Sequence, residues 1–423
     1  MSGCLPPLPG VSQGSRPATS RSPGEGGWPR DWHGLKIGFT TSIPVEVLLA
    51  AGAVPVDLNN RFITSPDPPA LVAQAEQAGL PRTICGWVKG IYATVLTSDD
   101  LAAIIAVTQG DCSNTHALIE LFQYQGKRVI TFAYPYDRCQ ATLAAEMDKL
   151  LRVFGVTYEE VKATKRRLDD IRRRLLRLDE LTWKEGKVTG EENHRYLVSA
   201  SDFTGDPELF AREVETFLEQ AEGRPGGGDG LRLGYVGVPP IWNDFYAVVE
   251  GIGPGSAAAT ELRPSASLPR GTNGAPALGR SRFPAARVVF NEMQRQFAML
   301  PAVEGGEARG ASPLPVEAPG PGRALFRQYL SYTYPYDVFA RIADIKREVR
   351  RRRLHGLIHY VQSFCFRQME DLLIRREVGL PMLTLEGDRP GPVEAPTRTR
   401  IESFIEMLTQ AQGKGVMRTE GRP

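Results

Sequence analysis

The stretch that decides the fold is residues 36–58, KIGFTTSIPVEVLLAAGAVPVDL. It begins with a short apolar strand, Lys36–Phe39, and Pro44 then opens an amphipathic helix, where proline suits the first turn. A second apolar strand follows at Val54–Leu58. Apolar strands and helices continue to alternate beyond it, and this alternation is typical of a parallel α/β sheet. Residues 35–139 are therefore predicted to form one α/β lobe.

A second α/β lobe is predicted for residues 231–412 and opens with RLGYVG at 232–237. Between the lobes, residues 140–230 carry long stretches with helical apolar spacing, which indicate a helical insertion. The predicted fold class is therefore α/β, with two Rossmann- or flavodoxin-like lobes that contain parallel sheets, plus this insertion. The tetrapeptide YPYD occurs at 134–137 and again at 334–337. Its order relative to the cysteine-bearing strands differs between the lobes, so a simple tandem duplication is not predicted.

Three segments are predicted to be disordered, because their composition cannot bury enough apolar area to offset the entropy lost on ordering. They are an N-terminal tail at 1–34 and two Pro/Gly-rich insertions at about 254–285 and 301–322; residues 413–423 form a C-terminal tail. The first 33 residues contain no apolar run long enough for a signal peptide or a spanning helix. A cytoplasmic protein with no membrane partner is therefore expected.

The charge balance argues against a protein that binds nucleic acid through its overall charge. The 423 residues include 51 basic and 49 acidic side chains, which gives a net charge of +2. The basic run Arg166–Arg177 also contains Asp169 and Asp170, and it is interpreted as a solvated helix face rather than a binding patch. No nucleic-acid partner is expected.

Three of the five cysteines share a setting that suits metal binding. Cys112 and Cys365 each follow a strand and start a helix, and Cys85 stands at another boundary between elements. Ligands of open α/β sheets bind at the carboxyl ends of strands, and helix N-termini favour the thiolate that binds metal. The three thiolates could converge on one soft-metal site, where zinc and iron–sulfur are the usual occupants. Since there is no CxxC motif, buried structural thiols remain the competing interpretation.

Ser42, Glu46 and His359 are the candidate catalytic side chains. Ser42 and the two threonines before it lie at a strand end, where hydroxyl groups could meet a ligand or satisfy the turn. Glu46 could act as an acid or base, or favour the first turn of its helix electrostatically. His359 lies on the strand that precedes Cys365, and His116 lies one turn after Cys112. Either histidine could approach a metal or be an ordinary, fully hydrogen-bonded one.

Several segments resemble one known family in their sequence and in their order. These are IGFTTSIPVEVLLAAGAVPVDL, ICGWVKG, VTQGDCSNTHAL, LIHYVQSFCFRQMEDLL, LPMLTLEGD and TRTRIESFIEML. Together they resemble the iron–sulfur subunits of the 2-hydroxyacyl-CoA dehydratase family, which also includes benzoyl-CoA reductase and the double-cubane cluster proteins. The resemblance covers about residues 35–410, apart from the two insertions. It implies that Cys85, Cys112 and Cys365 ligate a [4Fe–4S] cluster with one iron left open.

The resemblance also implies a reaction and a set of partners. In the family, a separate iron–sulfur activator hydrolyses ATP and supplies one low-potential electron, and a 2-hydroxyacyl-CoA then loses water through a ketyl radical. The chain has no GxxxxGK[ST] phosphate loop, which fits an ATP reaction on a separate protein. The expected partners are an acyl-CoA substrate, the activator, and a second subunit that is identical or related.

Two other functions are open at this point. One is a low-potential reductase of the benzoyl-CoA-reductase or double-cubane type, and the other is a non-catalytic metal-binding accessory protein. A double cubane needs six thiolates, and the chain has five cysteines, of which Cys4 lies in the predicted tail. A single cubane is therefore preferred, with Cys139 as the reserve ligand.

Overall fold

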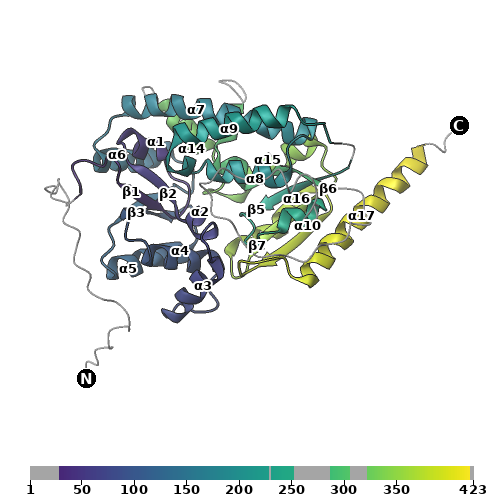
Figure 1. The fold of residues 1–423 in the computed structure, drawn as a ribbon, viewed down its shortest axis with the longest axis horizontal. Helices are drawn as coiled ribbons and strands as arrows, with labels where there is room; N and C mark the ends of the chain where they lie inside the picture. The colour runs from purple at the N-terminus through teal and green to yellow at the C-terminus, as the bar shows by residue number, and fades with distance from the viewer. Residues whose placement is uncertain (1–27, 228–229, 252–285, 305–321, 420–423) are drawn as a thin grey trace.

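Two four-stranded sheets form the frame of the molecule (Figure 1). The computed structural model describes residues 28–227, 230–251, 286–304 and 322–419. The first sheet contains β1 (Lys36–Phe39), β2 (Val54–Asp57), β3 (Leu101–Gln109) and β4 (Val129–Ala133). The second contains β5 (Leu231–Gly237), β6 (Ala286–Asn291), β7 (Gly356–Gln362) and β8 (Met382–Gly387).

The two sheets have the same topology. Their strand orders are β2-β1-β3-β4 and β6-β5-β7-β8, and all the pairs are parallel. In each sheet the first strand of the lobe therefore lies between the second and the third. All seven residues of β7 are buried, as expected for a parallel strand covered on both faces. These sheets confirm the predicted α/β class with two Rossmann- or flavodoxin-like lobes.

Helices cover the sheets of both lobes. Those of the first lobe are α1 (Val45–Ala50), α2 (Leu58–Ile63), α3 (Pro68–Gln77), α4 (Gly86–Leu96) and α5 (Ser113–Tyr124). Those of the second lobe are α10 (Phe245–Glu250), α12 (Glu292–Phe297), α13 (Leu300–Glu304), α14 (Arg323–Ser331), α15 (Val338–Arg352), α16 (Glu370–Val378) and α17 (Ala395–Thr419). None of the helices in the described ranges is long and apolar enough to cross a membrane.

The predicted helical insertion is present and lies across both lobes (Figure 1). It contains α6 (Gln140–Phe154), α7 (Tyr158–Glu180), α8 (Gly190–Ser199) and α9 (Pro207–Glu222). Capping boxes begin two of these helices, Thr157 with Glu160 and Thr189 with Glu192. Such reciprocal bonds satisfy N–H groups that a helix start otherwise leaves free. The sequence therefore defines these helix starts locally.

The two YPYD segments meet where the lobes join. The ring of Tyr134 lies 6.0 Å from that of Tyr332 and 5.9 Å from that of Tyr336, both edge-on. The guanidinium of Arg138 lies 4.7 Å from the centre of the Tyr336 ring and 3.6 Å from the carboxylate of Asp337. The repeated tetrapeptide thus marks a packed junction between the lobes.

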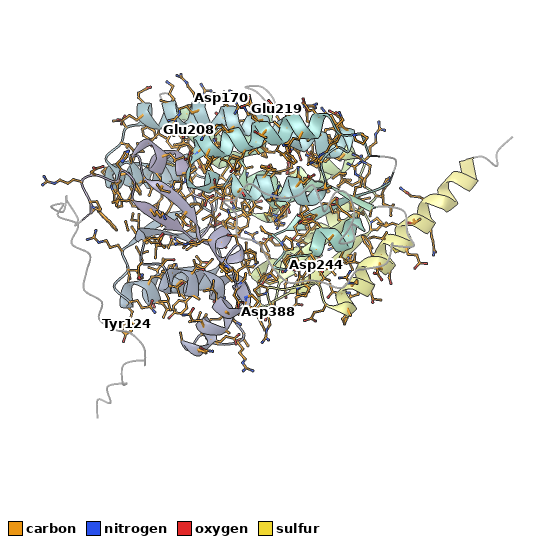
Figure 2. All side chains as sticks on the ribbon, in the orientation of Figure 1. Tyr124, Asp170, Glu208, Glu219, Asp244 and Asp388 are labelled. Carbon is orange, nitrogen blue, oxygen red and sulfur yellow. The ribbon has the colours of Figure 1, made fainter. Side chains whose placement is uncertain are left out.

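A second close approach joins the lobes beside Cys85. A Cβ atom on Gly86 would lie 2.1 Å from the carbonyl oxygen of Asp388, so a larger residue would push the two backbones apart. Figure 2 shows Asp388 at the lower edge of the molecule, close to the junction of the lobes. Glycine at this position therefore lets the start of α4 contact the second lobe.

The folded part begins before the predicted boundary at residue 35. Trp32 is 2% exposed, its ring lies 4.7 Å from that of Phe154, and its Nε1 donates to the carbonyl of Val153. An indole buries a large apolar area, so one tryptophan anchors a segment otherwise poor in apolar side chains. At the other end, α17 continues past residue 412.

Most of the segments predicted to be disordered lie outside the described residues. This applies to residues 1–27, 254–285 and 305–321. Residues 301–304 belong to helix α13 instead of an insertion. The structure describes no side chain beyond residue 412 either.

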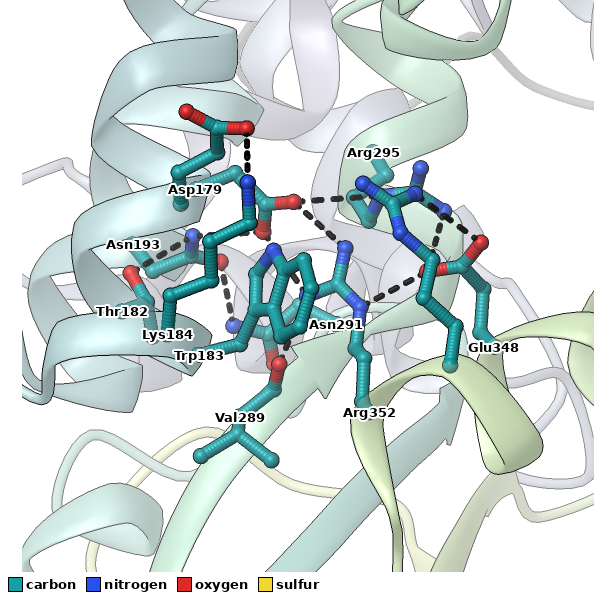
Figure 3. Close-up of polar contacts among 12 residues, drawn as sticks. Asp179, Thr182, Trp183, Lys184, Asn193, Val289, Asn291, Arg295, Glu348 and Arg352 are labelled. Atoms are coloured by element: carbon teal, nitrogen blue, oxygen red, sulfur yellow. Dashed lines mark hydrogen bonds and ion pairs between the residues drawn. The ribbon is translucent and has the colours of Figure 1, made fainter.

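A buried ion network joins the insertion to the second lobe (Figure 3). Arg352 on α15 forms hydrogen-bonded ion pairs with Asp179 of α7 and with Glu348 of its own helix. Arg295 on α12 lies 3.5 Å from Asp179 and 3.9 Å from Glu348. All four side chains are fully buried. Each charge has an opposite charge beside it, which is the condition under which such groups are tolerated in a core.

Candidate functional site

A cavity with about 140 Å³ of space for the centres of water molecules lies where strands of both lobes end. Residues at or after the carboxyl ends of β1, β3, β5 and β7 line it, namely Ser42, Cys112, Val238 and Gln362. Helices α4 and α8 contribute further wall residues. Open parallel sheets bind their ligands at this end of the strands, so the cavity is the candidate site.

Cys85, Cys112 and Cys365 all line this cavity. Each is the residue directly before a helical segment: Cys85 before α4, Cys112 before α5, and Cys365 before the turn Phe366–Gln368 that leads into α16. Two thiols therefore come from the first lobe and one from the second. The structure brings together the three cysteines that the sequence singled out.

Burial dominates the protonation of these thiols. It raises the pKa of Cys85 to about 12 and that of Cys112 to about 11, and it also raises the pKa of Cys365. Backbone N–H groups at the helix starts act in the opposite direction but are outweighed. The expected thiolate-favouring effect of the helix N-termini is thus too small here. Ligation by a metal would reverse the balance, since the ion's own charge deprotonates its thiols.

The three cavity cysteines have the donor chemistry of a soft-metal or iron–sulfur site. Among the described residues, no group of three or more His, Cys, Asp or Glu side chains lies close enough to hold one metal ion. In a [4Fe–4S] cubane each thiolate binds a different iron, so the ligands are spread more widely than around one ion. Three cysteine thiols from separate helix starts, facing one cavity, match the soft ligands that such clusters use.

Arg367 and Asp111 are charged groups in the cavity wall next to the cysteines. Arg367 is 5% exposed; it donates to Glu370 and to the carbonyl of Tyr334, whose ring centre lies 4.2 Å from the guanidinium carbon. Its positive charge lowers the pKa of the neighbouring Cys365, against the effect of burial. Burial raises the pKa of Asp111 to about 6. The guanidinium thus favours negative charge at this end of the cavity.

Ser42 is the one predicted catalytic residue that reaches the cavity. Its side chain is buried in the wall, and Thr40 and Thr41 line the cavity beside it. The hydroxyl of Tyr134 donates to the backbone carbonyl of Ser42 at 2.7 Å, and this contact fixes the end of β1. The end of β1 thus places three hydroxyl-bearing residues in the cavity wall, and the hydroxyl of Thr40 accepts a hydrogen bond from the backbone N–H of Val107.

The structure does not bring Glu46 into the cavity. Its oxygens accept hydrogen bonds from Arg172 at 2.8 Å, from Gln328 at 2.7 Å and from Tyr329 at 2.7 Å. Burial opposes its ionisation, but Arg172 and these hydrogen bonds hold the pKa of Glu46 below its usual value. It is therefore an ionised carboxylate that joins α1 to α7 and α14, and its position gives it no access to a ligand in the cavity.

His359 also lies away from the cavity. It is 1% exposed, and its Nδ1 is 2.7 Å from the carboxylate of Asp371. This contact helps to keep Asp371 ionised, with its pKa at about 2. His116 lines an adjoining surface groove. Cys139, the reserve ligand, precedes α6 and lines neither of these two pockets. These three side chains are therefore not part of the thiol cavity.

Sequence reasoning missed three neutral polar side chains in the cavity wall. Trp87 Nε1, Gln362 Oε1 and His194 Nδ1 are buried atoms without a hydrogen-bond partner, and all three residues line the cavity. Trp87 and Gln362 stand close to cysteines in the sequence, which is a signal that could have found them. His194 belongs to α8 of the insertion, and no motif surrounds it.

The chain matches the profile of a protein family described as 2-hydroxyglutaryl-CoA dehydratase, D-component. The match covers residues 40–270 and 285–408, well over half of the chain. It takes in both lobes, the insertion and the three cavity cysteines. Among curated proteins, no match to the chain is found.

Proposed function

The chain belongs to the 2-hydroxyglutaryl-CoA dehydratase D-component family and is a dehydratase-type subunit; from this premise we propose that it is an iron–sulfur subunit that removes water from a 2-hydroxyacyl-CoA. The observation that carries the proposal is the convergence of three thiols from two lobes on one cavity. Cys85, Cys112 and Cys365 would hold a [4Fe–4S] cluster there. When bound, the cluster would supply one low-potential electron to the thioester and take it back at the end of the turnover. The ketyl radical would lose hydroxide from C2 and the resulting radical would lose a proton from C3, so that water leaves with no net change of oxidation state.

The chain's own residues would bind and shield the substrate. The hydroxyl groups of Thr41 and Ser42 lie at the end of β1, where they can donate to an oxygen of the bound thioester. Arg367 offsets the negative charge that three thiolates bring beside it. The buried apolar wall excludes water, which strengthens these electrostatic contacts.

A single cubane is the form that the cysteines support. A double cubane would need six thiolates, whereas three cysteines line the cavity and Cys139 does not. ATP would act on a separate activator protein that delivers the electron, because the chain lacks a phosphate loop. A second subunit, identical or related, would complete the enzyme.

The test is formation of the enoyl-CoA product under anaerobic conditions. The reconstituted chain is given a 2-hydroxyacyl-CoA and titanium(III) citrate as the one-electron donor, and products are followed by mass spectrometry. We expect product with wild type and with Cys139→Ser, and none with Cys112→Ser. A protein that holds its full iron content and forms no enoyl-CoA, with or without an activator and a partner subunit, would contradict the proposal.

A further inference from the structure

The wall of the thiol cavity is mostly hydrocarbon. Its apolar members come from both lobes and from the insertion, and include Ile63, Val88, Ile91, Val198, Val238 and Phe297. A ligand that fills this space loses its water, because apolar side chains offer no hydrogen bonds in exchange. Transfer from water into the cavity is favourable in free energy for hydrocarbon groups and unfavourable for charged groups.

In the part of the wall that the structure describes, positive charge is confined to the end beside the cysteines. Among the described residues that line the cavity, Arg367 is the only arginine or lysine. Its two terminal nitrogens are already bonded, one to Glu370 and the other to the carbonyl of Tyr334. Asp57 adds a carboxyl group to the wall, and its oxygens accept from Ser201 and Asn59. An anionic group placed elsewhere along the described wall, away from Arg367 and the cysteines, would therefore have no cation beside it.

His194 does not supply a charge either. Burial lowers the pKa of His194 to about 3, so its imidazole is neutral at physiological pH. Its Nδ1, together with Trp87 Nε1 and Gln362 Oε1, has no hydrogen-bond partner. Buried polar atoms without partners cost stability, but these three groups carry no charge that could receive an anion.

We infer that the cavity takes a neutral, largely hydrocarbon acyl group with hydroxyl and carbonyl oxygens, and rejects acyl groups that end in a carboxylate. The inference rests on the acyl-CoA function proposed above and adds the substrate class. It sets this chain apart from a 2-hydroxyglutaryl substrate, whose acyl group carries a second carboxylate. That carboxylate would enter the hydrocarbon wall without a cation to receive it.

The experiment compares two thioesters with the same five-carbon acyl chain. Pentanoyl-CoA and glutaryl-CoA differ only in the terminal carboxylate, and CoA alone gives the baseline. Binding to the full-length, anaerobically reconstituted protein is measured by calorimetry and by quenching of tryptophan fluorescence, to which Trp87 in the wall contributes. We expect pentanoyl-CoA to bind at least about tenfold more tightly than glutaryl-CoA. The free-energy cost of burying an unpaired carboxylate exceeds the free energy that corresponds to a tenfold difference in affinity.

One variant adds a positive charge to the hydrocarbon part of the wall. Val198→Lys places a cation in the wall, and we expect it to strengthen glutaryl-CoA binding and weaken pentanoyl-CoA binding. Val156→Lys is the matched control, because Val156 is also half-buried but lies outside the cavity; it should leave both affinities unchanged. Thermal unfolding of both variants verifies that they fold.

The outcomes separate this inference from the function on which it rests. Equal binding of the two thioesters, or tighter binding of glutaryl-CoA, would overturn the inference and leave the acyl-CoA function standing. If neither thioester binds more tightly than CoA alone, the acyl-CoA function itself fails, and the inference with it. Preference for pentanoyl-CoA that Val198→Lys reverses would support both.

Discussion

The ion network and the thiol cavity are two buried polar regions built in opposite ways. In the network, Arg352 and Arg295 face Asp179 and Glu348, so every charge has an opposite charge beside it (Figure 3). The cavity wall contains three thiols whose pKa values burial raises, and three residues that each have a buried polar atom without a hydrogen-bond partner. Both regions are enclosed by side chains, but the charges of the network are balanced within the chain, whereas the three polar atoms of the cavity residues have no hydrogen-bond partner.

This difference distinguishes side chains that stabilise the fold from side chains that could contact a ligand. Buried charges persist where partners compensate them, and breaking such a pair leaves an uncompensated charge. Unpaired polar atoms lower stability, and natural proteins keep them mainly where function needs them. The network is therefore expected to dominate stability, and the cavity to respond to ligands.

The largest effect is expected from breaking the network. Asp179→Ala removes the carboxylate shared by Arg352 and Arg295 and should cost about 3–5 kcal/mol of unfolding free energy, measured by urea denaturation. Asp170→Ala is the matched control on the same helix, since Asp170 is exposed and pairs with Arg173 at the outer surface in Figure 2. It should cost less than about 1 kcal/mol. Equal losses would contradict the comparison.

The pH dependence of stability should distinguish the two regions. The pKa of His194 falls from an ordinary 6.5 to about 3 on folding, so its neutral form stabilises the fold above pH 6.5, and this stability is lost as the pH falls from there towards 3. Burial raises the pKa of Glu348, but Arg295 and Arg352 outweigh it and hold the pKa far below its usual range. Its contribution is therefore lost only below about pH 4.5.

The difference in unfolding free energy between wild type and His194→Gln should change by about 2 kcal/mol between pH 7 and pH 5, because glutamine does not titrate. Urea denaturation at pH 8, 7, 6 and 5 measures the slope of stability for both proteins. The two slopes should coincide between pH 8 and pH 7 and diverge below. Parallel curves over the whole range would show that His194 is not buried in its neutral form.

The smallest effect is expected for an unpaired group in the cavity. Trp87→Phe removes an N–H that has no partner, so the ligand-free protein should change in stability by less than about 1 kcal/mol. Trp32→Phe is the control, because the Nε1 of Trp32 donates to Val153 and that hydrogen bond is lost. The control should be the more destabilised of the two in thermal unfolding. The reverse order would contradict the assignment of Trp87 as unsatisfied.

The sequence predicted the parts of the molecule that are encoded locally. Strand and helix patterns around residues 36–58 specify a parallel lobe, and the parallel arrangement brings the carboxyl ends of the strands together. Cys112 and Cys365 follow such ends, so the sequence alone predicted that their side chains would converge. The same reasoning placed Ser42 at the cavity.

The parts that were missed depend on contacts between distant segments. Glu46 stands at a helix start, and nothing nearby indicates Gln328 or Tyr329, which are more than 280 residues away. His194 reaches the cavity only because α8 packs beside β6. The thiol pKa values follow from burial, which outweighs the helix N-termini and is set by the tertiary structure.

The most direct test of the central claim is the iron and acid-labile sulfide content of the anaerobically purified chain, with EPR of the reduced protein. Wild type, Cys85→Ser, Cys112→Ser and Cys365→Ser are compared with Cys139→Ser, whose thiol lies outside the cavity. We expect about four irons in wild type and in Cys139→Ser, and loss of the cluster or of its stability in the other three. A wild-type chain without iron, or cavity variants that keep all of it, would contradict the three-thiol site and the function built on it.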